Sequence, residues 1–104
     1  MHGNAKKNTN PHHLYDIFKR AGRDTFKYGI SDDPIDEEDG LSARVRDQVE
    51  EWNMAAEYNK FGAEILINDI AGRENALLIE RQYIDAYYEE HGRNPLGNKF
   101  PKRK

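Results

Sequence analysis

The stretch YDIFKRAGRDTFKYGIS, residues 15–31, largely decides the fold expected of this chain of 104 residues. Apolar and aromatic residues gather at both ends of the stretch, whereas AGRD, residues 21–24, holds the glycine and aspartate of a turn. The pattern predicts a β-hairpin with strands over residues 14–19 and 25–31. Both strands carry a tyrosine and the second ends in Gly-Ile-Ser, so these residues are candidates for a functional site as well as for a hairpin.

The rest of the chain predicts, in order, a helix, a strand and a helix. Apolar residues at helical spacing predict a helix over residues 42–58, which Ser42 or a nearby aspartate is expected to cap. The β-rich run AEILIND predicts a third strand over residues 63–69, and a second helix is expected over residues 73–91, ending at Gly92. The order ββαβα predicts an α+β domain with a small three-stranded, mainly antiparallel sheet and helices packed on it.

The composition indicates one small, well-solvated domain. Hydrophobic residues make up 37% of the chain and charged residues 34%, so there is room for a single modest core. Residues 1–12 are polar and lack periodicity, so they are expected to form a flexible lead-in, with residues 13–104 as a single domain that ends in a basic tail. No apolar run approaches the roughly 20 residues of a membrane span. The absence of cysteine excludes disulfides and thiolate metal sites.

The net charge of −3 is distributed unevenly along the chain. Residues 1–31 carry six Lys/Arg against two Asp/Glu, residues 32–57 carry two against ten, and residues 58–104 carry eight against seven. The last six residues include four of these cations, Lys99, Lys102, Arg103 and Lys104. Because a polyanion responds to the local field, the hairpin and the basic tail are compatible with phosphate binding despite the negative total.

The predicted helix over residues 73–91 has one carboxylate on its apolar face. With about 100° per residue, Glu80 lies between Ile84 and Tyr87 in the middle of that face. A carboxylate there is costly unless it is paired, protonated or bound to a metal. Two interpretations are therefore left open, a structural Glu–Arg ion pair and a metal ligand.

The predicted helix over residues 42–58 presents polar residues beside its apolar face. Arg44 and Gln48 share one flank at i, i+4, and Arg46 lies on the other. An arginine at the edge of such a face can bind a phosphate through two parallel hydrogen bonds, although most such arginines are only solvated. Trp52 has apolar helical neighbours and is expected in the core rather than as a platform for a stacked base.

These features together resemble the GIY-YIG nuclease family. Tyr15 in HLYDIF resembles the tyrosine of the first strand motif, and Gly29 and Ser31 in KYGIS resemble the end of the second. The family's second tyrosine lies two residues before the glycine, where this chain has Lys27, and Tyr28 is adjacent to the glycine instead. Which tyrosine faces the site is therefore left open.

The helical motifs extend the resemblance over residues 14–98. Arg44 resembles the arginine on the helix after the hairpin, and Glu80 in ALLIERQYIDAYY resembles the metal-binding glutamate of the later helix. Asn98 in NPLGNK resembles the asparagine that follows it. The segments KYGIS, AGRENALLIE and HGRNPLGNKFPK are most similar to the URI-type toxin domains that end bacterial polymorphic toxins.

The resemblance implies a metal-dependent endonuclease that hydrolyses phosphodiester bonds of nucleic acid, with DNA favoured over RNA and Mg²⁺ or Mn²⁺ as the cofactor. It implies Glu80 as the metal ligand and four catalytic residues, Tyr15, Tyr28, Arg44 and Glu80. The substrate-binding residues would be Lys27, Ser31, Gln48, Asn98 and Lys99. The resemblance also implies export as part of a larger bacterial effector, action in the cytoplasm of the target cell, and a cognate immunity protein.

Two other functions are compatible with the sequence. One is a catalytically silent nucleic-acid-binding module of the same fold, because Lys27 occupies the position of the family's second tyrosine. The other is a protein-interaction domain that uses the acidic loop over residues 32–40 and needs neither a metal nor Glu80. The adjacent His12 and His13 are expected to be free in the polar lead-in rather than to bind a metal.

Overall fold

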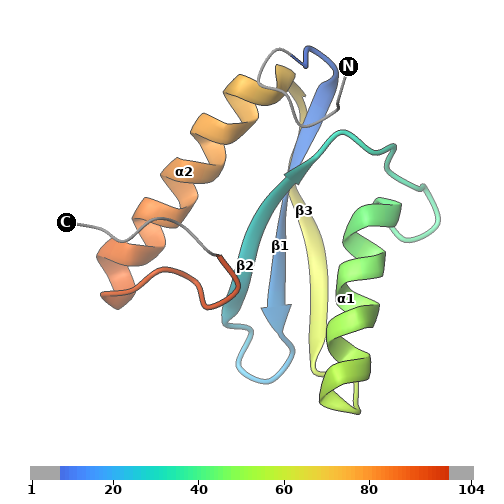
Figure 1. Ribbon diagram of the computed structural model, residues 1–104, viewed down its shortest axis with the longest axis vertical. Helices are drawn as coiled ribbons and strands as arrows, with labels where there is room; N and C mark the ends of the chain where they lie inside the picture. Colours follow the sequence, from blue (N-terminus) through green and yellow to red (C-terminus); the bar gives the residue numbers. More distant parts are fainter. Residues whose placement is uncertain (1–7, 99–104) are drawn as a thin grey trace.

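The computed structural model describes residues 8–98, so Lys99 and the other three cations of the tail lie outside the described residues. The described part contains five elements in the predicted order ββαβα (Figure 1). They are β1 (Pro11–Lys19), β2 (Thr25–Ser31), α1 (Ala43–Ala56), β3 (Phe61–Ala71) and α2 (Gly72–His91). The bounds of β2 are those predicted, and α2 begins one residue before the predicted helix and ends before Gly92 as expected.

The three strands form one antiparallel sheet with the order β2-β1-β3, which confirms the predicted α+β fold. Successive residues of a strand point to opposite faces, so neighbouring residues of β1 belong to different cores. Leu14 packs in a cluster with Ala76 of α2, whereas Tyr15 packs in a second cluster with Val45 of α1. Each helix therefore covers its own face of the sheet, as Figure 1 shows.

The central strand begins at Pro11, three residues before the predicted start at residue 14. His12 pairs with Ile70 of β3 and His13 pairs with Ser31 of β2, and both histidine side chains are buried. The expectation that these histidines are free in a flexible lead-in is therefore wrong. Burial of the two imidazole rings is tolerated because each has a polar partner. For His12 the partner is the Asn10 carbonyl oxygen, which lies 2.6 Å from Nδ1.

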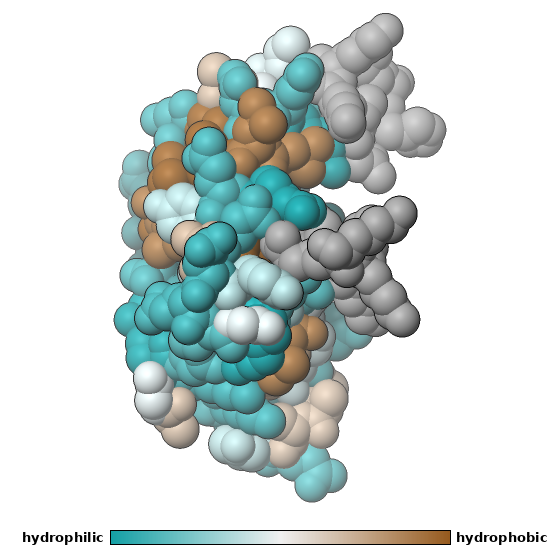
Figure 2. Space-filling model, turned by 90° about the vertical axis from the view of Figure 1, so that its left-hand side faces the viewer, coloured by the Kyte–Doolittle hydropathy of each residue, from teal (hydrophilic) through white to brown (hydrophobic). Residues whose placement is uncertain are grey.

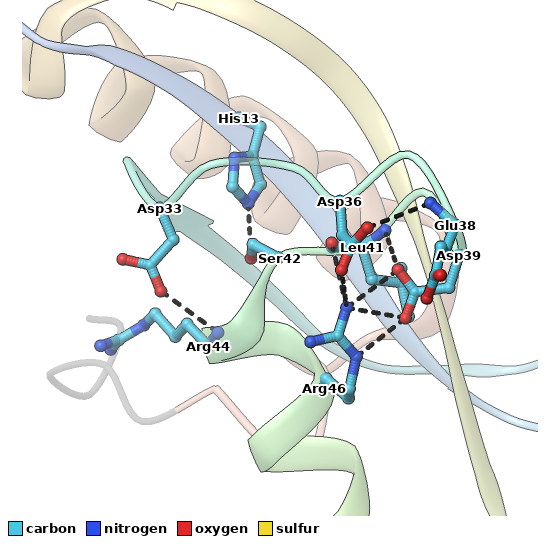
Figure 3. Close-up of polar contacts among 9 residues, drawn as sticks. All are labelled: His13, Asp33, Asp36, Glu38, Asp39, Leu41, Ser42, Arg44 and Arg46. Carbon is cyan, nitrogen blue, oxygen red and sulfur yellow. Dashed lines mark hydrogen bonds and ion pairs between the residues drawn. The ribbon is translucent and has the colours of Figure 1, made fainter.

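The polar partner of His13 is Ser42, at the start of α1. His13 Nε2 lies 3.1 Å from the Ser42 hydroxyl, so Ser42 occupies the N-cap position without making a side-chain capping bond (Figure 3). The cap comes instead from Asp33, whose carboxylate accepts the backbone N–H of Arg44 at 3.2 Å. The helix ends at Ala56, two residues before the prediction.

The acidic loop before α1 is folded against the helix. The Arg46 guanidinium donates two hydrogen bonds to the Asp39 carboxylate, at 2.8 and 2.9 Å, and lies 3.7 Å from the Asp36 carboxylate (Figure 3). Arg46 thus neutralises part of the loop's charge within the fold. This arrangement leaves fewer acidic groups for a protein partner than the sequence suggests.

The surface on the side of α2 is divided by polarity. Seen from that side, apolar residues gather in the upper part, where the N-terminal half of α2 lies, and the lower part is mostly hydrophilic (Figure 2). Leu78 of α2 is among the large apolar residues with exposed side chains. Between residues 8 and 98 we find no helix with the length and apolar character needed to cross a bilayer.

Candidate active site

An open cleft of about 720 Å³ runs along β2 between the two helices. Its walls come from β1, β2, α1, the start of α2 and the segment after α2. Seven of the residues predicted to act at a site line it, namely Tyr15, Lys27, Tyr28, Ser31, Arg44, Glu80 and Asn98. The fold therefore brings together residues that are spread over nearly the whole described chain.

Tyr15 lies at the floor of the cleft, with only 1% of its surface exposed. Its ring crosses Gly29, its pairing partner on β2, so closely that a Cβ at position 29 would lie 2.8 Å from Cε1 and closer still to Cζ and Oη. The glycine of KYGIS is thus required for the approach of this ring. The Tyr15 hydroxyl donates a long hydrogen bond of 3.4 Å to Oε1 of Gln48 on α1.

Lys27, and not Tyr28, shares the partner of the Tyr15 hydroxyl. The Lys27 ammonium group donates to the same Gln48 Oε1 at 3.3 Å. Lys27 and Gly29 are two residues apart in β2, so both lie on the strand face that is turned toward α1. Burial lowers the pKa of Lys27, the Arg44 charge lowers it further, and the Glu80 charge opposes the change. Gln48 therefore joins a tyrosine hydroxyl and a cation in the cleft.

Tyr28 is directed to the other face of the sheet. Its ring lies against Tyr83 of α2, with 5.5 Å between the ring centroids. Burial raises the pKa of the Tyr28 hydroxyl, and a hydrogen bond with Thr25 opposes that effect. The two tyrosine side chains therefore lie on opposite faces of the sheet, and Lys27 shares the α1 face with Tyr15.

Glu80 of α2 reaches the cleft as a partly buried carboxylate. Burial raises its pKa, and the positive charges of Lys27 and Arg73 partly offset that effect. Within residues 8–98, no cation lies within ion-pair distance of the Glu80 carboxylate. The structure thus offers no described partner for the alternative of a structural Glu–Arg ion pair.

Two arginines supply positive charge near Glu80 and Tyr15. The Arg44 side chain is exposed and extends away from the contacts that hold Arg46 (Figure 3). Burial raises the pKa of the Tyr15 hydroxyl, and the Arg44 charge lowers it in opposition. Arg73 also lines the cleft, and its buried Nε has no hydrogen-bond partner in the described part of the chain.

Arg73 is a cleft residue that was not predicted from the sequence, although its position contained a usable signal. Arg73 lies seven residues before Glu80, so the two side chains fall on nearly the same side of α2. A cation on the same side of the helix as an anomalous carboxylate, about two turns away, is a candidate member of the same site. Its unpartnered Nε makes it a candidate phosphate ligand.

Asn98 and Ser31 use their polar groups to build the walls of the cleft. The Asn98 side-chain carbonyl accepts the backbone N–H of Tyr28 at 2.9 Å, and its amide donates to the Tyr28 carbonyl at 2.8 Å. This pair of bonds closes the free edge of β2 as a neighbouring strand would. Ser31 Oγ accepts the backbone N–H of Asp33 at 3.0 Å. Direct contact of either residue with a substrate stays a prediction.

The residues of the cleft fit a hydrated divalent cation better than an ion held wholly by protein. No group of three or more His, Asp or Glu side chains suited to a metal occurs between residues 8 and 98. Mg²⁺ keeps several of its waters and is often bound through one or two carboxylates. The Glu80 carboxylate, which no described cation pairs, has the chemistry for this kind of binding.

The family described as URI fold toxin 2 matches the chain over residues 5–92. Neither the curated proteins nor the solved structures gave a match to the chain. The matched range includes Tyr15, Lys27, Arg44 and Glu80 and ends before Asn98.

Proposed function

This chain belongs to the URI fold toxin 2 family, and we propose that it is a metal-dependent endonuclease that forms the toxin domain of a larger exported bacterial effector. The observation that carries the proposal is the cleft in which Tyr15, Arg44 and Glu80 meet. We further propose that it acts in the cytoplasm of the target cell and that a cognate immunity protein protects the producing cell. DNA is the proposed substrate in preference to RNA.

Phosphodiester hydrolysis needs a positioned water and positive charge around the phosphate. Arg44 and Arg73 would bind the phosphate oxygens, because a guanidinium presents parallel donors that match a phosphate. Their placement on α1 and α2 supports binding from the two sides of the cleft. Lys27 would add a third positive charge at its floor.

Tyr15 would orient the attacking water through its hydroxyl. Burial raises the pKa of this group, so the hydroxyl keeps its proton at neutral pH and serves as a hydrogen-bonding group. Gln48 holds the hydroxyl, and the buried ring cannot turn away because Gly29 lies beneath it. Tyr15 is therefore placed with little freedom to lose when the substrate binds.

Glu80 would hold Mg²⁺ or Mn²⁺ in its ionised form. When bound, such an ion stabilises the negative charge that develops on the phosphate oxygens and the leaving group. Burial of the Glu80 carboxylate favours its protonated form when no cation is present. Cation binding and ionisation of Glu80 should therefore reinforce each other.

The alternative of a catalytically silent binding module is favoured by one observation, the presence of Lys27 where the GIY-YIG nucleases that the sequence resembles have their second tyrosine. The two functions differ in whether strands are cut. Purified protein incubated with plasmid DNA and with total RNA, in Mg²⁺ and in EDTA, should cleave only when Mg²⁺ is present. Binding without cleavage of either nucleic acid would favour the silent module.

The two tyrosines should respond differently to loss of the hydroxyl. Tyr15→Phe is expected to lower kcat about 5- to 150-fold, because removing a hydrogen bond from an oriented group costs about 1–3 kcal/mol. Tyr28→Phe serves as the matched control and should stay close to wild type, since its ring lies against Tyr83. Cleavage assays with circular dichroism melts of both variants test this. Full activity in Tyr15→Phe would remove Tyr15 from the proposed site.

Arg44 and Arg46 form a second matched pair on the same helix. Arg44→Ala should lower kcat more than it raises KM, as expected for a charge that acts on the reacting phosphate. Arg46→Ala should leave kcat unchanged and change stability little, because its partners are the exposed Asp36 and Asp39. Steady-state kinetics and thermal melts give both readouts. A raised KM with unchanged kcat in Arg44→Ala would limit Arg44 to simple binding.

A further inference from the structure

Three side chains follow one another along the side of α1 that faces the cleft. Arg44, Gln48 and Trp52 are spaced at i, i+4 and i+8, so they form one ridge with about 6 Å of helix rise between successive members. Arg44 and Trp52 both line the cleft, and Gln48 contacts Tyr15 between them. The ridge therefore extends the cleft from the proposed phosphate position toward an aromatic ring.

Trp52 is only partly a core residue. Its ring packs against Phe26 and Phe61, with centroids 4.9 and 5.7 Å away, yet it stays partly exposed and lines the cleft. Lys27 Nζ lies 5.7 Å from the ring centroid. The expectation that Trp52 belongs to the core is thus correct for one part of the ring, while another part is available in the cleft.

Gly97 forms the wall beside this ring. A Cβ at Gly97 would lie 2.7 Å from the Phe26 ring and 2.9 Å from Lys27 Cβ, so only glycine lets the segment after α2 lie this close to β2. The Gly97 N–H donates to the Phe26 carbonyl at 2.7 Å and holds the segment there. The end of the cleft near Trp52 is therefore bounded by backbone on one side and an aromatic ring on the other.

We propose that Trp52, Lys27 and Gly97 form a subsite for an unpaired nucleobase, so that the substrate is single-stranded nucleic acid or a strand that has separated locally from a duplex such as a plasmid. The inference rests on the proposed function, because it places a base next to the phosphate held by Arg44. Aromatic side chains bind single strands by stacking on the bases, and a neighbouring cation binds the backbone. A base inside a duplex is covered on both faces and would have to leave the stack to reach Trp52.

The two ends of the cleft differ in charge, because the end opposite Trp52 is acidic. Asp32 and Asp33 follow the end of β2 and line the cleft there. Hydrogen bonds from the amides of Asn8 and Asn10 lower the pKa of Asp32, so this carboxylate stays ionised. Negative charge at that end disfavours further phosphates, and the strand should therefore extend past Lys27 toward Trp52.

The test uses the protein unchanged, because Trp52 is its only tryptophan. Intrinsic fluorescence is titrated in EDTA at one salt concentration with three probes, a thymidine dodecamer, an abasic deoxyribose-phosphate chain of equal length, and a 12-base-pair duplex. We expect the thymidine dodecamer to quench Trp52 and to bind about 5- to 150-fold more tightly than the abasic chain, as stacking of one base predicts. Equal quenching by the abasic chain, or tighter binding of the duplex, would overturn the subsite.

A variant pair adds a kinetic arm. Trp52→Leu should lower kcat/KM on a single-stranded oligonucleotide about 5- to 150-fold, and Tyr58→Leu, which removes an exposed aromatic ring outside this cleft, should not. The probe comparison in the native protein decides the matter if Trp52→Leu fails to fold. Base-dependent quenching without cleavage of any substrate keeps the subsite and rejects the nuclease. Cleavage with no preference for bases over the abasic chain in binding keeps the nuclease and rejects the subsite.

Discussion

Gly29→Ala is expected to lower the free energy of unfolding by about 1–3 kcal/mol, the usual cost of overpacking, and to remove most of the cleavage activity. The new methyl group would overlap Cζ, Oη and Cε1 of the Tyr15 ring. Since Tyr15 is buried between α1 and the sheet, its ring cannot move without displacing Gln48 or the backbone of β2. Urea unfolding and plasmid cleavage measure the two effects.

A double-mutant cycle with Tyr15→Leu separates the clash from other effects of the methyl group. If the clash is the cause, Gly29→Ala should cost clearly less stability when the ring is absent, while the double variant stays inactive. The same cost in both backgrounds would show that the glycine serves the backbone rather than the ring. Wild-type stability and activity in Gly29→Ala would contradict the close approach of Tyr15 to β2.

The elements of the fold could be predicted because their signals are local. Alternating apolar residues and a Gly-Arg-Asp turn mark β2, and Gly92, with φ at 74°, marks the end of α2. The start of β1 could not be predicted in this way. His12 and His13 are polar by type, and they are buried because β3 and Ser42 lie beside them, contacts made with residues far along the chain.

The candidate site was predictable where one residue departs from the pattern of its own element. Glu80 is recognisable as a carboxylate on an apolar helix face, and Arg44 with Gln48 as a polar flank. The face on which Lys27 and Tyr28 lie depends on the pairing register of β2, which the sequence of one strand does not specify. Arg73 was not predicted, because its signal is its position seven residues before Glu80, whereas its immediate neighbours are those of a solvated arginine.

Glu80→Gln is the second change with a large expected effect. It should lower cleavage at least about 100-fold, by removal of the charge that would hold the cation, and leave nucleic-acid binding largely intact. Because no described cation pairs with Glu80, the variant should be as stable as wild type or more stable in EDTA. A structural ion pair would instead cost about 3–5 kcal/mol when broken.

The pH dependence of stability gives this prediction a sign. Burial raises the pKa of Glu80 above its ordinary value of 4.5. At pH values between 4.5 and the raised pKa, the folded protein therefore binds more protons than the unfolded chain. The contribution of Glu80 to stability should therefore fall as pH rises through that window. In EDTA, wild type and Glu80→Gln should melt closest together near pH 4 and differ most at pH 7, with the variant more stable.

The most direct test of the account is therefore thermal melting and plasmid cleavage measured on the same sample of Glu80→Gln at pH 7. Melting is recorded in EDTA and cleavage in Mg²⁺, with wild type treated identically. The account predicts a melting temperature equal to or above that of wild type together with the loss of cleavage. A strongly destabilised variant, or a stable variant that still cuts the plasmid, would contradict the role of Glu80 as the residue that holds the metal.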